Sequence, residues 1–135
     1  MEFSRFTAKT LDEALAQAAA AKEVDKEEIT YTVIEEKSGF LGIGKTVEIE
    51  VFTPYDIAKF IEEYVLTYFR NAHIKGECSV EYTAPDFYKI FVNTDLNAML
   101  IGKGGQTLQL FNRLVRMAAS SAFKKRIRCL IDVNG

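Results

Sequence analysis

Residues 100–107 read LIGKGGQT, a turn of three glycines and one lysine between two segments whose apolar residues follow helical spacing. Glycine has no Cβ, so a ligand can approach the main chain closely at such a turn. Lys103 adds positive charge, and the first N–H groups of the following helix are free to donate to an anion. A helix–GxxG–helix unit of this kind can clamp the backbone of a single-stranded nucleic acid. The turn is therefore the first candidate binding site.

Charge is distributed unevenly along the chain. The 135 residues carry a net charge of −2, whereas domains that bind nucleic acids are usually basic. Residues 95–135, however, contain seven Lys and Arg against two Asp and Glu, a net charge of +5, while residues 1–54 contain six against eleven, a net charge of −5. Salt screens exposed charges beyond about 8 Å. The local excess therefore matters more than the average, and it surrounds the glycine turn.

Composition excludes several classes of protein. The sequence has no run of 18 apolar residues, and its first residues lack the apolar segment of a secretory signal, so we expect a soluble cytoplasmic protein with no transmembrane segment. Cys78 and Cys129 are isolated, and His73 is the single histidine. These spacings match neither a zinc site nor a disulfide framework. We expect reduced thiols, no metal and no cofactor.

Two segments in the first part of the chain alternate apolar and polar residues, as strands do. They cover residues 30–34 and 46–52, are rich in β-branched side chains and enclose a glycine-rich loop, so we expect a long hairpin. Thr10, followed three residues later by a glutamate, gives a capping-box pattern ahead of an alanine-rich helix. With a first strand at residues 3–6, residues 1–53 are predicted to form a small β-α-β-β domain.

After Pro54 the pattern changes to that of an amphipathic helix, which Asp56 can cap. Strand-like segments follow at residues 77–83 and 87–93, and Asp95 can cap a short helix that leads into the glycine turn. The apolar positions of the two long helices are Ile57, Phe60, Ile61, Tyr64, Val65 and Tyr68, and then Leu108, Phe111, Leu114, Val115 and Ala118. A last strand at residues 126–133 completes the order α-β-β-α-α-β, and the predicted class is α+β.

This order, with GxxG between its fourth and fifth elements, resembles the type II KH domain, a fold that binds single-stranded nucleic acid. The resemblance covers residues 55–135, within a predicted domain of residues 54–135. The chain as a whole is similar to the first two modules of the bacterial Jag family, also called SpoIIIJ-associated or KhpB-type proteins. The residues that carry this similarity are KSGFLGIG at 37–44, LIGKGGQTL at 100–108 and LIDVNG at 130–135.

The family normally continues into a third, C-terminal module that contains an arginine and a histidine spaced by three residues. The sequence ends at Gly135 without this module, so no function of that module is carried over. The resemblance implies a cytoplasmic bacterial RNA-binding protein, an RNA chaperone that pairs with a small single-KH protein. It further implies a role in cell elongation, cell shape and cell-wall biogenesis.

The predicted RNA site begins at the glycine turn. Gly102 and Gly105 would allow the sharp turn, Gly104 would permit close approach of the RNA backbone, and Lys103 would meet phosphate. Leu100 and Ile101 would form an apolar wall for splayed bases. Polar and basic side chains extend the site along the following helix and the last strand, namely Gln106, Arg113, Arg126 and Arg128.

Other readings of the same residues remain open. The turn can serve only to connect two helices, and the polar stripe Gln106, Gln109, Arg113, Arg116 and Ser120, within about 80° of one helical face, can simply be solvated. The alternative function is a protein-interaction module in which the KH fold forms a heterodimer with another KH domain, or a homodimer, and RNA contact is indirect.

Residues 39–46, GFLGIGKT, also satisfy the P-loop pattern GxxxxGK[ST]. A P-loop needs a helix directly after its lysine and threonine, whereas the sequence predicts a strand there. We therefore expect no nucleotide binding at this loop and no enzymatic activity. Phe40, Leu41 and Ile43 are instead expected to form an apolar hairpin tip, either folded onto the domain or offered to a protein partner.

Overall fold

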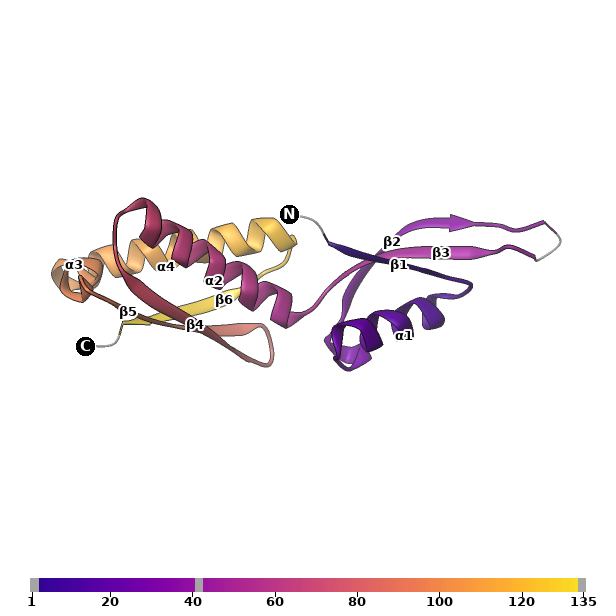
Figure 1. The fold of residues 1–135 in the computed structure, drawn as a ribbon, viewed down its shortest axis with the longest axis horizontal. Helices are drawn as coiled ribbons and strands as arrows, with labels where there is room; N and C mark the ends of the chain where they lie inside the picture. Colours follow the sequence, from indigo (N-terminus) through magenta and orange to yellow (C-terminus); the bar gives the residue numbers. More distant parts are fainter. Residues whose placement is uncertain (1–2, 41–42, 134–135) are drawn as a thin grey trace. The chain divides into compact units, whose positions relative to one another are not determined.

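The computed structural model describes residues 3–40 and 43–133, and its elements follow the order predicted from the sequence. The chain forms two compact units, Met1–Pro54 and Tyr55–Gly135, each with its own sheet. In chain order the elements are β1 (Ser4–Ala8), α1 (Leu11–Lys22), a 3₁₀ turn (Lys26–Glu28), β2 (Thr30–Lys37), β3 (Thr46–Phe52), α2 (Pro54–Asn71), β4 (Gly76–Thr83), β5 (Phe87–Thr94), α3 (Asn97–Ile101), a second 3₁₀ turn (Lys103–Gly105), α4 (Gln106–Phe123) and β6 (Arg128–Val133) (Figure 1).

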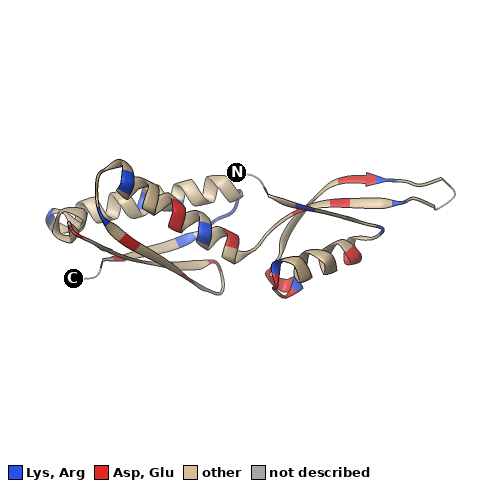
Figure 2. Ribbon diagram, viewed as in Figure 1, with Lys and Arg blue, Asp and Glu red and all other residues tan. Residues whose placement is uncertain are grey.

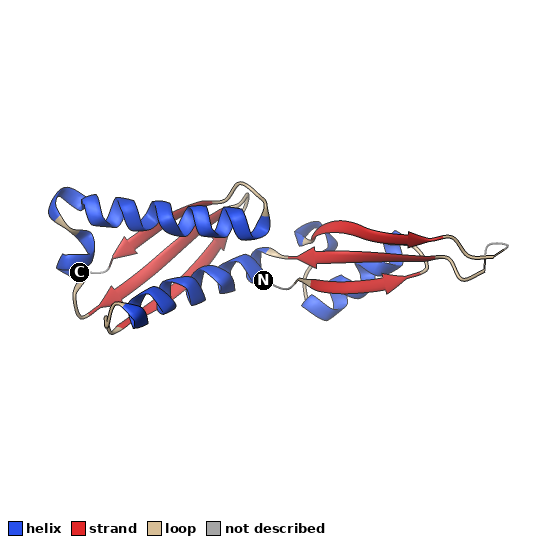
Figure 3. Cartoon of the chain, turned by 90° about the horizontal axis from the view of Figure 1, so that it is seen from above, coloured by secondary structure: helices blue, strands red, loops and turns tan. Residues whose placement is uncertain are grey.

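In the first unit, α1 covers one face of a three-stranded antiparallel sheet of order β1-β3-β2 (Figures 1 and 3). Strand alternation turns Ile49 and Val51 of β3 inward, where they pack with Ala14 and Ala18 of α1. The Thr10 hydroxyl caps α1, since its oxygen accepts the N–H of Glu13 at 3.1 Å. The predicted β-α-β-β order is confirmed.

In the second unit, α2 and α4 cover the same face of a sheet of order β4-β5-β6 (Figure 3). β4 pairs with β5 antiparallel, and β5 pairs with β6 in parallel. The two helices and the sheet supply these core residues: Ile57, Ile61, Val65 and Phe69 from α2, Phe111, Val115, Ala119 and Phe123 from α4, and Tyr88, Ile90, Val92, Cys129 and Ile131 from the sheet. Ile127, just before β6, is also buried in this core. The α+β class and the order α-β-β-α-α-β, that of a KH-like domain, are confirmed.

Two predicted caps are wrong. α2 begins at Pro54, two residues before Asp56, because a proline suits the first helical position, where its missing N–H costs nothing. Asp95 does not cap α3, since its Oδ1 accepts the N–H of Lys75 at 3.2 Å instead. The neighbouring Asn97 accepts the N–H of Thr94 at 2.7 Å and starts the helix.

The apolar stripes are also displaced at the helix ends. In α2, Phe69 is buried and the predicted Tyr68 is exposed, although the two rings remain in contact at 6.4 Å between centroids. In α4, Ala119 and Phe123 are buried while Leu114 is exposed. Across residues 3–40 and 43–133 we find no helix with the length and apolarity that a membrane span needs.

Candidate nucleic-acid interface

The glycine turn has a closed side and an open side. Gly102 has φ 74° and ψ 177°, and a Cβ at this position would lie 2.8 Å from the Cβ of Thr107 and 3.1 Å from its backbone nitrogen. Gly104 and Gly105 also have positive φ, 65° and 76°, but a Cβ added to either would meet no atom within 4 Å. Gly102 therefore closes the turn against α4, and the other two glycines leave their main chain open to a ligand.

The residues before the turn divide between core and surface. Leu100 is only 4% exposed, so its side chain packs in the core and does not form the predicted wall for bases. Ile101 is half-buried and Lys103 is exposed, so both side chains are within reach of a ligand at the turn. The wall was expected on both residues because sequence spacing alone does not tell which side of a one-turn helix faces inward.

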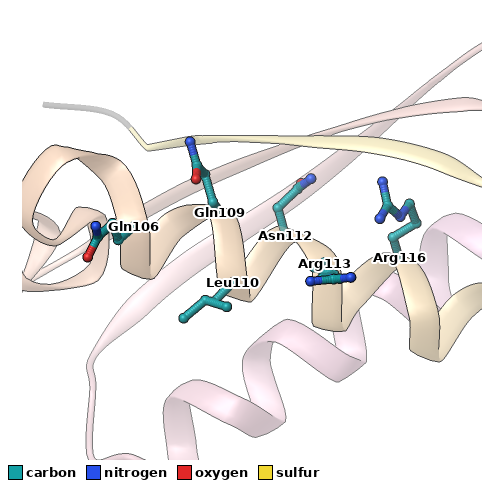
Figure 4. A pocket seen from close by; sticks show the side chains of 6 residues that line it. All are labelled: Gln106, Gln109, Leu110, Asn112, Arg113 and Arg116. Atoms are coloured by element: carbon teal, nitrogen blue, oxygen red, sulfur yellow. The ribbon is translucent and has the colours of Figure 1, made fainter.

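A hollow of about 580 Å³ lies along the first half of α4, directly after the turn. Figure 4 shows the six side chains that line it, which are Gln106, Gln109, Leu110, Asn112, Arg113 and Arg116. The predicted residues Gln106 and Arg113 therefore lie in one site, continuous along the chain with the glycine turn. The helical period explains this grouping, since residues three and four apart share a face.

The site is positively charged because α4 contains two arginines and no acidic residue. In Figure 2, no red segment appears along α4. Arg116 also lies close enough to Cys129 of β6 to lower the pKa of that thiol, although burial outweighs this effect and the pKa is raised to about 11. In Figure 4 the Arg116 side chain extends toward the β6 side of the hollow.

Asn112 is a member of the site that sequence analysis missed. Its Oδ1 accepts the backbone N–H of Ile131 in β6 at 3.1 Å. The residue lies about 40° beyond the predicted polar stripe, at 100° per residue, and next to the buried face. The position of a polar residue at the edge of an apolar stripe is the sequence feature that could have predicted this role for Asn112. Ser120, in the predicted stripe, instead accepts the N–H of Ile127 at 3.3 Å and holds the end of α4.

Arg126 and Arg128 are not part of this hollow. With Pro85 and Asp86 they line a second, smaller one of about 320 Å³ at the start of β6. Arg128 donates to the carbonyl of Pro85 at 3.0 Å, and Lys125 pairs with Asp86 at 2.8 Å. The 18 residues of α4 separate this cluster from the glycine turn, a helix length of about 27 Å.

A stripe of apolar side chains lies exposed beside the arginines of α4. Leu110, Leu114 and Met117 are 62%, 50% and 58% exposed, and their spacing of four and three residues places them on one face. Leu110 is shared with the hollow. Exposed apolar residues gathered on one face are typical of a contact surface.

In the first unit, the loop at residues 39–46 that matches the P-loop pattern connects two antiparallel strands, β2 and β3. β3 begins at Thr46, and a Cβ on Gly39 would clash with the backbone carbonyl of Ile43. No helix follows the lysine, so the loop lacks the helix N-terminus that holds phosphate in a P-loop. At the predicted tip, Phe40 and Ile43 form an isolated bridge and are 84% and 78% exposed. Leu41 lies outside the described residues.

The histidine follows a helix, and the two cysteines are free thiols, of which Cys129 is buried. His73 follows α2 with φ 58°, and its N–H donates to the carbonyl of Arg70 at 3.2 Å. Burial, together with the nearby Glu62 carboxylate, raises the pKa of the Cys78 thiol to about 12. Within the described ranges, no group of three or more His, Cys, Asp or Glu side chains is arranged to hold a metal ion.

Comparison with known proteins agrees with this arrangement. Residues 6–52 match the family model described as Jag N-terminus. The chain is 30% identical to the RNA-binding protein KhpB of Clostridium symbiosum over 135 residues, an alignment that covers 98% of this chain. The chain spans about 61% of the length of that relative.

The matched residues 6–52 fall within the first unit, and the alignment with the relative extends through the KH-like unit that carries the glycine turn. The two matches together cover both units described above. The first unit therefore matches the Jag N-terminus family, and the chain as a whole is similar to the RNA-binding protein KhpB.

Proposed function

We propose that this chain binds single-stranded RNA through its second unit, and that it is a binding protein without catalytic activity. The glycine turn would hold the RNA backbone and the hollow on α4 would receive its bases. The observation that carries the proposal is that two features adjoin. At Gly104 and Gly105 the main chain is open to a ligand, and next to it lies a hollow that is lined by Arg113 and Arg116 and by no carboxylate. The relative named as an RNA-binding protein supports it.

Each feature supplies one part of RNA recognition. Lys103 and the open main chain at Gly104 suit a phosphate, which binds without regard to sequence. Leu110 and the exposed side of Ile101 supply apolar area against which an unpaired base can pack. Gln106, Gln109 and Asn112 offer hydrogen bonds to base edges.

The test is RNA affinity of the double variant K103D/G104D, measured by fluorescence anisotropy with a labelled single-stranded oligonucleotide. Lys103 is exposed, a Cβ on Gly104 would meet no atom within 4 Å, and aspartate tolerates the left-handed backbone of Gly104, so the fold should persist. We expect affinity to fall at least tenfold at low salt. Unchanged affinity of a folded variant would contradict the RNA role of the turn.

A matched control is available in the first unit. The double variant K9D/Q17D makes the same change of three charge units at two exposed positions. We expect it to bind RNA as the wild type does. If both variants lose affinity equally, the loss reflects net charge and not the turn.

The finer family properties are also proposed for this chain. As an RNA chaperone it would accelerate annealing of complementary strands, and K103D/G104D would remove that acceleration in a strand-annealing assay. A cytoplasmic role in cell elongation and cell-wall growth would appear as altered cell length when the gene is deleted. Only the wild-type gene, and not the double variant, should restore the length.

A second candidate function is protein pairing, which the exposed apolar stripe Leu110, Leu114 and Met117 favours. Its partner would be a small single-KH protein or a second copy of this chain. Sedimentation with and without that partner should show a dimer that L114D abolishes. The exposed Phe40 and Ile43 at the hairpin tip would offer a separate contact to another protein, and F40D should leave the dimer intact.

A further inference from the structure

One hydrogen bond fixes how the Asn112 amide is presented. The backbone N–H of Ile131 donates to Asn112 Oδ1 at 3.1 Å. A backbone N–H can only donate, so the amide oxygen must face β6 and cannot exchange places with the nitrogen. The Asn112 Nδ2 group makes no hydrogen bond with the described residues. Its two N–H groups can therefore donate to a ligand in the hollow.

The bond also ties the hollow to the edge of the sheet. β6 pairs with β5 on one side, where Ile131 lies opposite Ile90, and it ends the sheet order β4-β5-β6. Asn112 therefore joins α4 to the edge strand. In Figure 4, Gln109, Asn112 and Arg116 extend from α4 to the same side, that of β6. A ligand in the hollow meets these three side chains together.

The hydrogen-bonding character of this side is dominated by donors. Asn112 offers two N–H groups, and the Arg116 guanidinium offers five with no acceptor. Gln109 can turn either end of its amide to a ligand, and no carboxylate lines the hollow. A ligand group that presents adjacent acceptors would satisfy these donors, whereas one that presents N–H groups would leave them unpaired.

We infer that Asn112, with Arg116, selects cytosine over uracil and adenine in the bound RNA. This inference rests on the proposed RNA-binding function. Cytosine presents two adjacent acceptors, O2 and N3, on its Watson–Crick edge. On the same edge uracil carries an N–H at the corresponding ring nitrogen, and adenine has its acceptor N1 beside an amino donor. Single-stranded RNA exposes these edges, so they are available for reading.

The experiment compares oligonucleotides of eight cytidines, eight uridines and eight adenosines by competition in fluorescence anisotropy at one salt concentration. We expect the wild type to prefer oligocytidine by about tenfold, the discrimination of one well-formed pair of hydrogen bonds. In N112D, the carboxylate still accepts the N–H of Ile131 but has no N–H for the base. The preference for oligocytidine should disappear in this variant.

S121D is the matched control, because it adds the same negative charge to an exposed position of α4 outside the hollow and leaves the bond between Asn112 and Ile131 intact. It should weaken binding of all three oligonucleotides alike and keep the order of preference. Equal affinity of the wild type for the three oligonucleotides would overturn the inference alone and would indicate that the donors meet phosphate. Retention of the preference by N112D would also overturn it, and binding to none would overturn the proposed function as well.

Discussion

At the residue scale, the two cysteines are held as neutral thiols. Burial raises the pKa of Cys78 to about 12 and that of Cys129 to about 11, against an ordinary value of 9.0. The folded state therefore disfavours the thiolate. The contribution of the Cys78 thiol to stability is constant below about pH 9 and is lost as the pH rises from there to about 12.

The chemical shift of each cysteine Cβ, followed by NMR against pH, tests this property. In denaturant both thiols should titrate near pH 9, whereas in the folded protein Cys129 should titrate at about pH 11 and Cys78 at about pH 12. C78S should remove the later of the two folded-state steps and leave the earlier one. A folded-state midpoint near pH 9 would show that the thiols are open to solvent.

Tyr88 is the core residue whose hydroxyl has no hydrogen-bond partner among the described residues. Its side chain is fully buried, and burial, with Tyr82 and Asp86 nearby, raises the pKa of its phenol. An unsatisfied buried hydroxyl costs about 1–3 kcal/mol. We expect Y88F to leave the free energy of unfolding unchanged or to raise it by about 1 kcal/mol. A loss of similar size in urea unfolding would show that the hydroxyl has a partner in solution.

At the scale of elements, periodicity predicted most of the fold because burial repeats regularly in it. The β3 pattern TVEIEVF alternates inward and outward, and its bounds were predicted without error. Helix ends were less predictable. Asp95 accepts a hydrogen bond from the backbone N–H of Lys75, 20 residues away, and therefore does not cap α3. Asn112 was missed for the same reason, because its partner Ile131 is 19 residues away and no local pattern records that contact.

The turn between α3 and α4 assigns different roles to its glycines. An alanine at Gly102 would meet Thr107 and adopt a backbone conformation that is almost exclusive to glycine. We expect G102A to lower the free energy of unfolding by about 3 kcal/mol. G104A has open space and a left-handed backbone, so its cost should be about 1 kcal/mol. Urea unfolding of both variants gives the comparison, and equal costs would contradict the closed side of the turn.

At the scale of the whole molecule, each unit has a separate core, so damage to one should remain in that unit. I49A removes core volume from the first unit and should lower its free energy of unfolding by about 2–5 kcal/mol. Domains of this size are marginally stable, so the variant should unfold the unit. We expect amides of β3 to lose protection from hydrogen exchange while amides of β5 keep it. I90A should do the reverse. Loss of protection in both strands with either variant would indicate one cooperative unit.

The uneven charge of the molecule determines how its RNA binding should respond to salt. For single strands, the logarithm of affinity falls with that of salt concentration by about 0.7 per neutralised phosphate. Lys103, Arg113 and Arg116 would give a slope of about −2, whereas adding the cluster of Lys124 and Arg126 beyond the end of α4 would give about −3.5. The distance of that cluster from the turn favours the smaller slope.

Two matched variants separate these cases, since each removes two positive charges. R113Q/R116Q removes them from the hollow on α4, so we expect its slope to fall to about −0.7. K124Q/R126Q removes them from exposed positions at the far end of α4 and should keep the wild-type slope of about −2. Titrations from 50 to about 300 mM salt measure both. A wild-type slope near −3.5 that falls in K124Q/R126Q would mean that RNA follows the whole length of α4, and that the charge excess of residues 95–135 acts as one surface.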